Sequence, residues 1–133
     1  MVLLLDTNVV SMFLKTSTVH DTRRQAIEAH VLGNIPAISF VTVAELLAWA
    51  ESKGWGEKKR AELETLLRVY TILDPTRETA EMWAKTKIKC ESAGAKKQPH
   101  DLWVAAAALQ YDLEVVTADS DFDGIPGLRV KKL

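Results

Sequence analysis

The 133-residue chain carries 17 basic and 18 acidic side chains, so its formal net charge of −1 excludes the overall basicity that attracts nucleic acids. A hydrophobic fraction of 47% suits one globular domain, and we expect residues 1–133 to form a single domain. The lone cysteine, Cys90, excludes an internal disulfide and favours a reducing, cytoplasmic compartment. No run approaches the ~18 apolar residues of a membrane span, so we expect no membrane association.

Short apolar runs alternate with longer segments of helical pattern along the whole chain. The pattern predicts strands at 2–5, 35–39, 70–73, 114–117 and 128–130. It predicts helices at 8–14, 21–32, 43–51, 57–67, 78–92 and 99–111. The last helix is apolar nearly all round, which predicts that it packs deep in the protein. Such alternation indicates an α/β protein whose parallel strands are joined by crossover helices.

Acidic residues stand where the predicted strands give way to helices or turns. Asp6 ends the first apolar run, Glu45 lies just inside a helix, Asp101 opens the apolar helix, and Asp119 follows the fourth strand. Parallel strands end at one edge of the sheet, where open α/β sheets place their ligand sites. Four carboxylates there repel one another unless a hard cation binds them. An all-oxygen site that keeps several waters suits Mg²⁺ or Mn²⁺.

Each acid also has an ordinary structural explanation. Asp6 or Asp101 can complement a helix N-terminus, a role that stabilises by roughly 0.5–2 kcal/mol. Thr42 and Glu45 have the spacing of a capping box, in which the Glu45 carboxylate reaches back to the backbone N–H of Thr42. Asp119 and the acids after it can be turn residues. These explanations do not account for acids at so many strand ends, and the joint pattern favours a metal site.

Four motifs occur in order along the chain: Leu5-Asp6-Thr7-Asn8, then Ser39 to Leu46 with Thr42 and Glu45, then Asp101 followed by Leu102-Trp103-Val104-Ala105-Ala106, then Thr117-Ala118-Asp119-Ser120-Asp121-Phe122 followed by Ile125-Pro126-Gly127-Leu128. Together they resemble the PIN-domain ribonucleases. Among these, the chain is most similar to the VapC-type toxins of bacterial and archaeal toxin–antitoxin pairs. The resemblance spans essentially the whole chain, and it implies a three-layer α/β/α sandwich around a central, mostly parallel sheet.

The resemblance also implies a site and a chemistry. An acidic quartet binds one or two Mg²⁺ or Mn²⁺ ions, and its members here are Asp6, Glu45, Asp101 and Asp119. Asp121 is an auxiliary ligand, and Glu45 is either a ligand or the group that orients the attacking water. The implied activity is that of a metal-dependent endoribonuclease, which cleaves RNA phosphodiester bonds with an activated water. We expect the Thr117 hydroxyl to position a phosphate oxygen or a water, unless Thr117 is only a β-branched strand residue.

The partners that the resemblance implies are an RNA substrate, a cognate antitoxin protein and a second copy of the chain in a homodimer. Trp49 and Trp55 flank the break between two predicted helices, a region that commonly contacts the antitoxin in this family. An exposed tryptophan there would anchor that interface.

Lysines are concentrated in one part of the sequence, toward the end of the fifth predicted helix and just after it. Because the acids alone repel RNA, basic side chains must attract its phosphates. Our candidates are Lys85, Lys87, Lys89, Lys96 and Lys97. The alternative for each of them is a solvated helix face.

Two other functions use a similar arrangement of acids. A metal-dependent phosphatase or phosphotransferase also places an Asp after its first strand, but its common motif has a second Asp two residues on, where this chain has Asn8. A non-catalytic binding module would use the acids as caps and would show no metal-dependent stabilisation.

Overall fold

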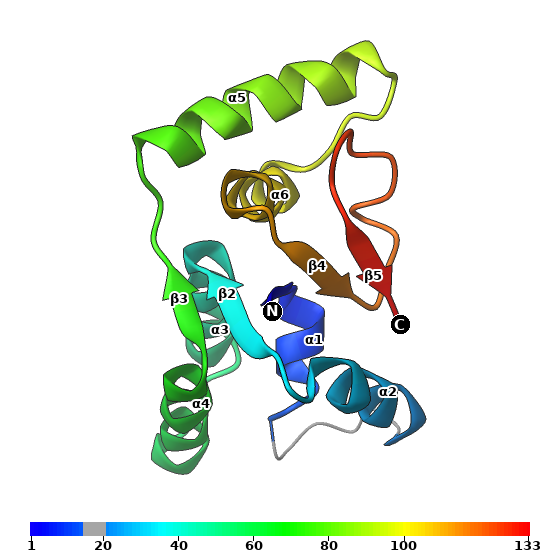
Figure 1. Ribbon diagram of the computed structural model, residues 1–133. Coiled ribbons are helices and arrows are strands. Elements are labelled where there is room, and N and C mark those ends of the chain that lie inside the picture. Colours follow the sequence, from blue (N-terminus) through cyan, green and yellow to red (C-terminus); the bar gives the residue numbers. More distant parts are fainter. Residues whose placement is uncertain (15–20) are drawn as a thin grey trace.

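The computed structural model describes residues 1–14 and 21–133, which form one five-stranded sheet flanked by helices (Figure 1). The strands are β1 (Val2–Leu5), β2 (Ile35–Ser39), β3 (Thr71–Leu73), β4 (Glu114–Thr117) and β5 (Val130–Lys132). The helices are α1 (Thr7–Ser11), α2 (Asp21–Val31), α3 (Phe40–Ser52), α4 (Glu57–Val69), α5 (Arg77–Ser92) and α6 (Pro99–Tyr111). The sheet order is β3-β2-β1-β4-β5 and each of these pairings is parallel, as predicted.

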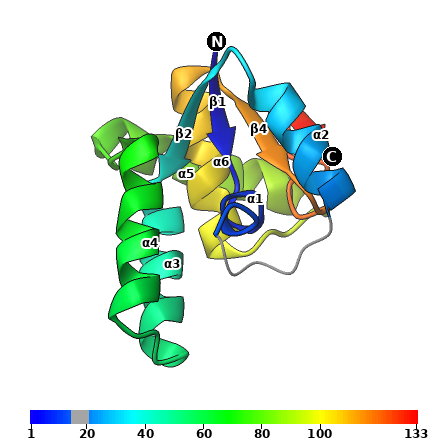
Figure 2. The same ribbon diagram turned by 90° about the horizontal axis from the view of Figure 1, so that it is seen from below.

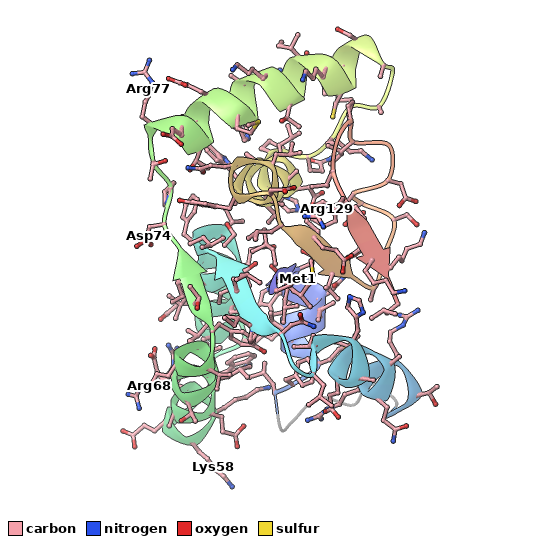
Figure 3. All side chains as sticks on the ribbon, in the orientation of Figure 1. Met1, Lys58, Arg68, Asp74, Arg77 and Arg129 are labelled. Atoms are coloured by element: carbon pink, nitrogen blue, oxygen red, sulfur yellow. The ribbon has the colours of Figure 1, made fainter. Side chains whose placement is uncertain are left out.

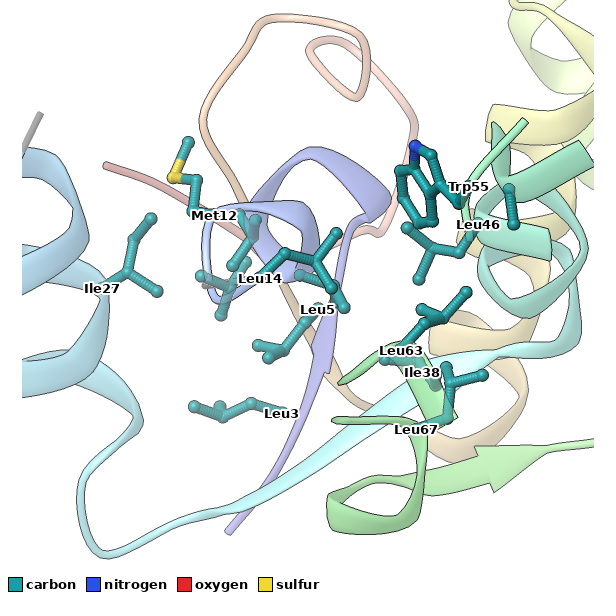
Figure 4. Close-up of a cluster of buried hydrophobic side chains, with 14 residues drawn as sticks. Leu3, Leu5, Met12, Leu14, Ile27, Ile38, Leu46, Trp55, Leu63 and Leu67 are labelled. Atoms are coloured by element: carbon teal, nitrogen blue, oxygen red, sulfur yellow. The ribbon is translucent and has the colours of Figure 1, made fainter. Parts of the chain in front are cut away.

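Helices cover both faces of the sheet, so the fold has the three layers that were predicted (Figures 1 and 2). Charged side chains such as Lys58, Arg68 and Arg77 project from the outside of the helices (Figure 3). Alternate residues of β1 point to opposite faces. Leu5 packs with α1 to α4 in the core drawn in Figure 4, and Leu4 packs with α5 and α6 in the other core.

Helix α6 is the innermost helix, as its apolar sequence predicts. Its alanines at 105–108 are no more than 4% exposed, and α5 crosses it on the outside (Figure 1). Pro99 occupies the first turn, where its fixed φ and missing N–H suit a helix start, and this start fixes where Asp101 emerges. Neither α6 nor another helix in the described residues has the length and apolar character needed to cross a membrane.

Two helix boundaries differ from the prediction. Helix α3 begins at Phe40, three residues early, because the Ser39 hydroxyl accepts a hydrogen bond from the Val41 N–H and caps the helix. Helix α1 ends at Ser11 because residues 12–14 form tighter bonds, each N–H donating to the carbonyl three residues earlier. Both differences lie close to the carboxyl edge of the sheet.

The last strand lies two residues later than predicted. The Leu128 N–H donates to the Ile125 carbonyl in a tight turn, and Gly127 has φ +77°, a left-handed conformation that favours glycine. The chain therefore becomes extended only at Val130. The other boundaries agree with the prediction within two residues.

The sheet order brings distant segments together at one edge. Strand β1 pairs with β2 on one side and with β4 on the other, and Leu5 lies opposite Val116. Because the strands are parallel, the residues after β1, β2 and β4 emerge at the same edge. The chain leaves β1 toward β2 and later returns to β1's other side, which makes this edge the switch point where open α/β sheets bind ligands.

Candidate active site

A cavity of about 130 Å³ opens at the carboxyl edge of the sheet. It is lined by Asp6, Thr7, Asn8, Glu45, Trp49, His100, Asp101, Asp119 and Asp121. The structure thus brings all five predicted acids together, although they come from four separate segments. One water needs only ~10–15 Å³ of such space, so the cavity has room for ions and waters. It is smaller than the roughly 300–1,000 Å³ of pockets that enclose an organic ligand.

Asp6 caps α1 and is only 8% exposed. Its Oδ1 accepts a hydrogen bond from the Thr7 N–H at 2.8 Å, and its Oδ2 accepts one from the Thr117 hydroxyl at 3.0 Å. Burial raises the pKa of Asp6 to about 6, the two hydrogen bonds oppose the rise, and the charges of Asp119 and Asp101 add to it. The helix cap and the cavity-lining acid are therefore the same side chain.

Asp119 is held by contacts from two strand ends. The Thr117 hydroxyl, fully buried at the end of β4, accepts a hydrogen bond from the Asp119 N–H at 3.3 Å. The Asn8 amide donates to Asp119 Oδ2, and the Asp121 N–H donates to Asp119 Oδ1 at 2.9 Å. The side-chain to backbone hydrogen bonds expected for acids in a turn are present, and they orient the Asp119 carboxylate toward the cavity.

Asp101 lies in the first turn of α6 and is 6% exposed. Burial raises the pKa of Asp101 to about 6; the neighbouring His100 opposes the rise, and the charges of Asp121, Asp119 and Glu45 add to it. His100 Nε2 lies 3.5 Å from Asp101 Oδ1, and the imidazole itself is half exposed. A nearly buried carboxylate surrounded by other carboxylates is unfavourable without a cation.

The capping-box interpretation of Glu45 is wrong. Thr42 lies inside α3, whose cap is Ser39. Glu45 Oε1 instead accepts a hydrogen bond from the Thr7 hydroxyl at 2.9 Å, and that hydroxyl is also 3.0 Å from the Thr42 hydroxyl. Glu45 is thereby linked to the residue that follows Asp6.

Sequence reasoning missed Trp49 as a cavity residue. Trp49 follows Glu45 by four positions on α3, so both side chains lie on one face of the helix, and both line the cavity. This spacing was available in the sequence. Trp55, by contrast, is only 9% exposed and belongs to the core, so it is not the exposed anchor considered above.

The cavity fits a cation with oxygen ligands. In residues 1–14 and 21–133, no three acidic, histidine or cysteine side chains lie close enough as they stand to hold a metal ion. The cavity nevertheless offers carboxylates with raised pKa values, and buried Asn8 Oδ1 has no hydrogen-bond partner among those residues. An unpaired buried oxygen costs roughly 1–3 kcal/mol. A hard cation would relieve that cost and the repulsion once side chains rotate inward.

The predicted lysines separate into two groups. Lys87, Lys96 and Lys97 line a second hollow, which touches the first turn of α6. Lys85 and Lys89 do not line it; they are exposed and share another flank of α5, being four residues apart.

A parallel sheet with an acid-lined cavity at its switch point defines an α/β protein with a polar ligand site. The PIN domain family model matches residues 3–128, and the chain belongs to that family. It is similar to the Ribonuclease VapC5 of Mycobacterium tuberculosis (strain ATCC 25618 / H37Rv), with 32% identity over 119 residues that cover 88% of this chain and 84% of that protein.

Solved structures show the same fold. VapBC2 from Rickettsia felis, bound to a DNA fragment from its promoter, superposes with a TM-score of 0.85 at 23% identity, covering 99% of this chain and 98% of that chain. VapBC-5 from Mycobacterium tuberculosis, a member of the VapBC family of toxin–antitoxin systems, gives a TM-score of 0.70 at 28% identity, with 99% and 98% covered.

Proposed function

We propose that the chain is a Mg²⁺- or Mn²⁺-dependent endoribonuclease and the toxin of a toxin–antitoxin pair. The observation that carries this proposal is the acidic cavity, where five carboxylates from distant segments line one small space. Membership of the PIN-domain family and the 32% identity to a ribonuclease support the reaction type. The alternatives, a phosphatase or a binding module, have no comparable support.

One or two ions would be held by Asp6, Asp101 and Asp119, with Asp121 as an auxiliary ligand. When bound, a divalent cation lowers the pKa of a water and neutralises phosphoryl oxygens. Glu45 either adds a ligand or orients the attacking water.

Hydrogen bonds from neighbouring side chains restrain three of the carboxylates. The Thr117 hydroxyl donates to Asp6, the Asn8 amide donates to Asp119, and the Thr7 hydroxyl donates to Glu45. Partners of this kind limit the rotation that the ligands must make to close on a cation. Because Asp6 and Asp101 have pKa values raised to about 6, cation binding must release protons below that pH and weakens as the pH falls.

We propose an antitoxin protein and a homodimer as further partners of this chain. Similar structures of toxin–antitoxin complexes support the antitoxin. Two apolar hollows also support it. They share Phe13, Leu66 and Val69, and Leu32 lines one of them. Exposed apolar side chains such as Leu32 (84%) and Val69 (64%) mark protein interfaces. Light scattering of the chain alone and after co-expression with an antitoxin measures both associations; a monomer in the first case contradicts the homodimer.

The function is tested by incubating total cellular RNA with the purified chain in Mg²⁺, in Mn²⁺ and in EDTA. We expect discrete fragments that need the metal and disappear in Asp101→Asn. The matched control is Asp74→Asn, which removes the same charge from an exposed position between β3 and α5 and should cleave like the wild type (Figure 3).

Intact RNA in every condition, with no thermal shift on adding metal, would mean that the acids serve only as caps and that the chain is a binding module. Hydrolysis of a phosphate monoester without RNA cleavage would favour the phosphatase.

A further inference from the structure

Another hollow, of about 490 Å³, lies on the other side of the first turn of α6. It is lined by Trp83, Lys87, Glu91, Lys96, Lys97, Gln98, Pro99 and Leu102, and we call it the lysine hollow. Pro99 and Leu102 come from the same helical turn that places His100 and Asp101 in the acidic cavity. The two hollows therefore share one wall.

The lysine hollow is positively charged. Lys87 forms an ion pair with Glu91, with 2.6 Å between Nζ and Oε1, so these two charges offset each other. Within the described residues, Lys96 and Lys97 form no ion pair, and Lys97 is half-buried. With three lysines against one acid, the hollow has an excess of two positive charges beside a cavity of carboxylates, and the charge of Lys96 also acts on Glu91. This contrast suits a polyanion that must approach an acidic site.

The two hollows differ in the size of the group that they can hold. About 490 Å³ falls within the roughly 300–1,000 Å³ of pockets that hold organic ligands, whereas the acidic cavity is too small for one.

Two contacts join the helices that form the wall of the lysine hollow. Trp83 stacks on Trp103 with 5.3 Å between ring centroids, and its indole N–H donates to the Pro99 carbonyl at 3.4 Å. These contacts tie α5 to the start of α6, so the lysine hollow keeps its position relative to Asp101.

We propose that the lysine hollow binds backbone phosphates of single-stranded RNA to one side of the cleaved bond, through Lys96 and Lys97. This inference rests on the proposed function, since it requires RNA in the acidic cavity. Contacts to phosphates fix the register of a nucleic acid without reading its sequence. The lysine hollow therefore positions the strand, while the acids act on it.

The test compares two double variants that remove the same charge. Lys96→Gln with Lys97→Gln alters the lysine hollow, and Lys85→Gln with Lys89→Gln alters the other flank of α5. Lys87 is left intact because its removal would expose the negative charge of Glu91. Binding of labelled single-stranded RNA is measured in EDTA over a range of salt concentrations, and cleavage by the wild type is assayed separately in Mg²⁺.

A plot of log K against log salt concentration has a negative slope, and each lost phosphate contact makes it shallower by ~0.7 for a single strand. The first pair should therefore make the slope shallower by about 1.4. The control pair should leave the slope unchanged, because Lys85 and Lys89 do not line the lysine hollow and we assign them to a solvated helix face. RNA trimmed to a single nucleotide on the side of the cleaved bond that reaches the lysine hollow should abolish the difference between the wild type and the first pair.

Equal slopes for the two pairs would contradict RNA binding at the lysine hollow. If the wild type still cleaved RNA with metal, the proposed function would stand. A shallower slope for the first pair, with no cleavage by the wild type, would support RNA binding at the lysine hollow and contradict the proposed function. If polyglutamate bound as tightly as RNA and lost the same affinity in the first pair, the lysine hollow would be a surface for an acidic protein, and the RNA assignment would be wrong.

Discussion

The two sides of the first turn of α6 are built in opposite ways. On one side, Asp6 and Asp101 are 8% and 6% exposed and are positioned by strand ends and a helix start. On the other, Lys96 and Lys97 lie on the connection between α5 and α6 and are exposed or half-buried. Acids that must hold an ion need fixed positions, whereas lysines that attract a strand act over several ångströms.

This contrast has an energetic consequence. A buried carboxylate whose pKa is raised destabilises the folded protein at neutral pH, while an exposed lysine costs almost nothing. The acidic cavity therefore retains residues that lower stability, which is common at sites selected for function. The lysines of the lysine hollow do not lower the stability in this way.

The largest effect is expected from Asp6→Asn. Cleavage should fall by more than ~100-fold, since even residues that only orient metal ligands are worth ~10–100-fold. The free energy of unfolding in EDTA at pH 7 should rise by up to about 3 kcal/mol, because folding raises the Asp6 pKa from 3.8 to about 6. Cleavage rates and chemical denaturation measure the two quantities.

Lys96→Gln is the matched contrast, with an unfolding free energy within ~0.5 kcal/mol of the wild type. An Asp6→Asn protein that was less stable, yet still cleaved RNA, would remove the distinction between the two sides.

The pH dependence of stability should be dominated by the acidic side. In EDTA, the folded state keeps protons on Asp6 and Asp101 up to about pH 6, whereas the unfolded chain releases them near the ordinary pKa of 3.8. The folded state binds more protons in that window, so the stabilisation that these two groups contribute is full below pH 3.8 and is lost as the pH rises to about 6. Asp6 alone contributes about 3 kcal/mol to this fall.

Denaturation curves from pH 4 to pH 7 give the slope directly. Asp6→Asn should flatten it and the Lys96 and Lys97 variants should not. A wild-type protein that became more stable over this range without metal would contradict the raised pKa values.

The fold and the acidic cavity could be predicted because both depend on order along the chain. Alternating strands and helices dictate a parallel sheet, and acids such as Asp6 and Asp119 at strand ends must then meet at its edge. The capping-box interpretation failed because it is local. Ser39 started α3 three residues early, which placed Thr42 inside the helix and turned Glu45 toward Thr7.

The lysine hollow was less predictable. Helical periodicity alone separates Lys87 from Lys85 and Lys89, so that distinction was present in the sequence. The positions of Lys96 and Lys97 depend instead on how α5 crosses α6, a tertiary contact fixed by Trp83 and Trp103. No local pattern predicts such a crossing.

The smallest effect is expected at Thr117, which supports the acidic side without lining the cavity. Its hydroxyl donates to Asp6 Oδ2 at 3.0 Å and accepts from the Asp119 N–H at 3.3 Å. Thr117→Val keeps the shape and removes both bonds, so cleavage should fall by ~10-fold, the low end for residues that orient metal ligands. The pKa of Asp6 should rise further, because the lost bond lowered it.

Thr117→Ser separates the two interpretations of this position. Serine keeps the hydroxyl and loses the β-branching that favours a strand, so it should cleave nearly as fast as the wild type if orientation of Asp6 is the role. If valine cleaved normally and serine did not, Thr117 would be only a strand residue, and Asp6 would hold its direction through the Thr7 N–H alone.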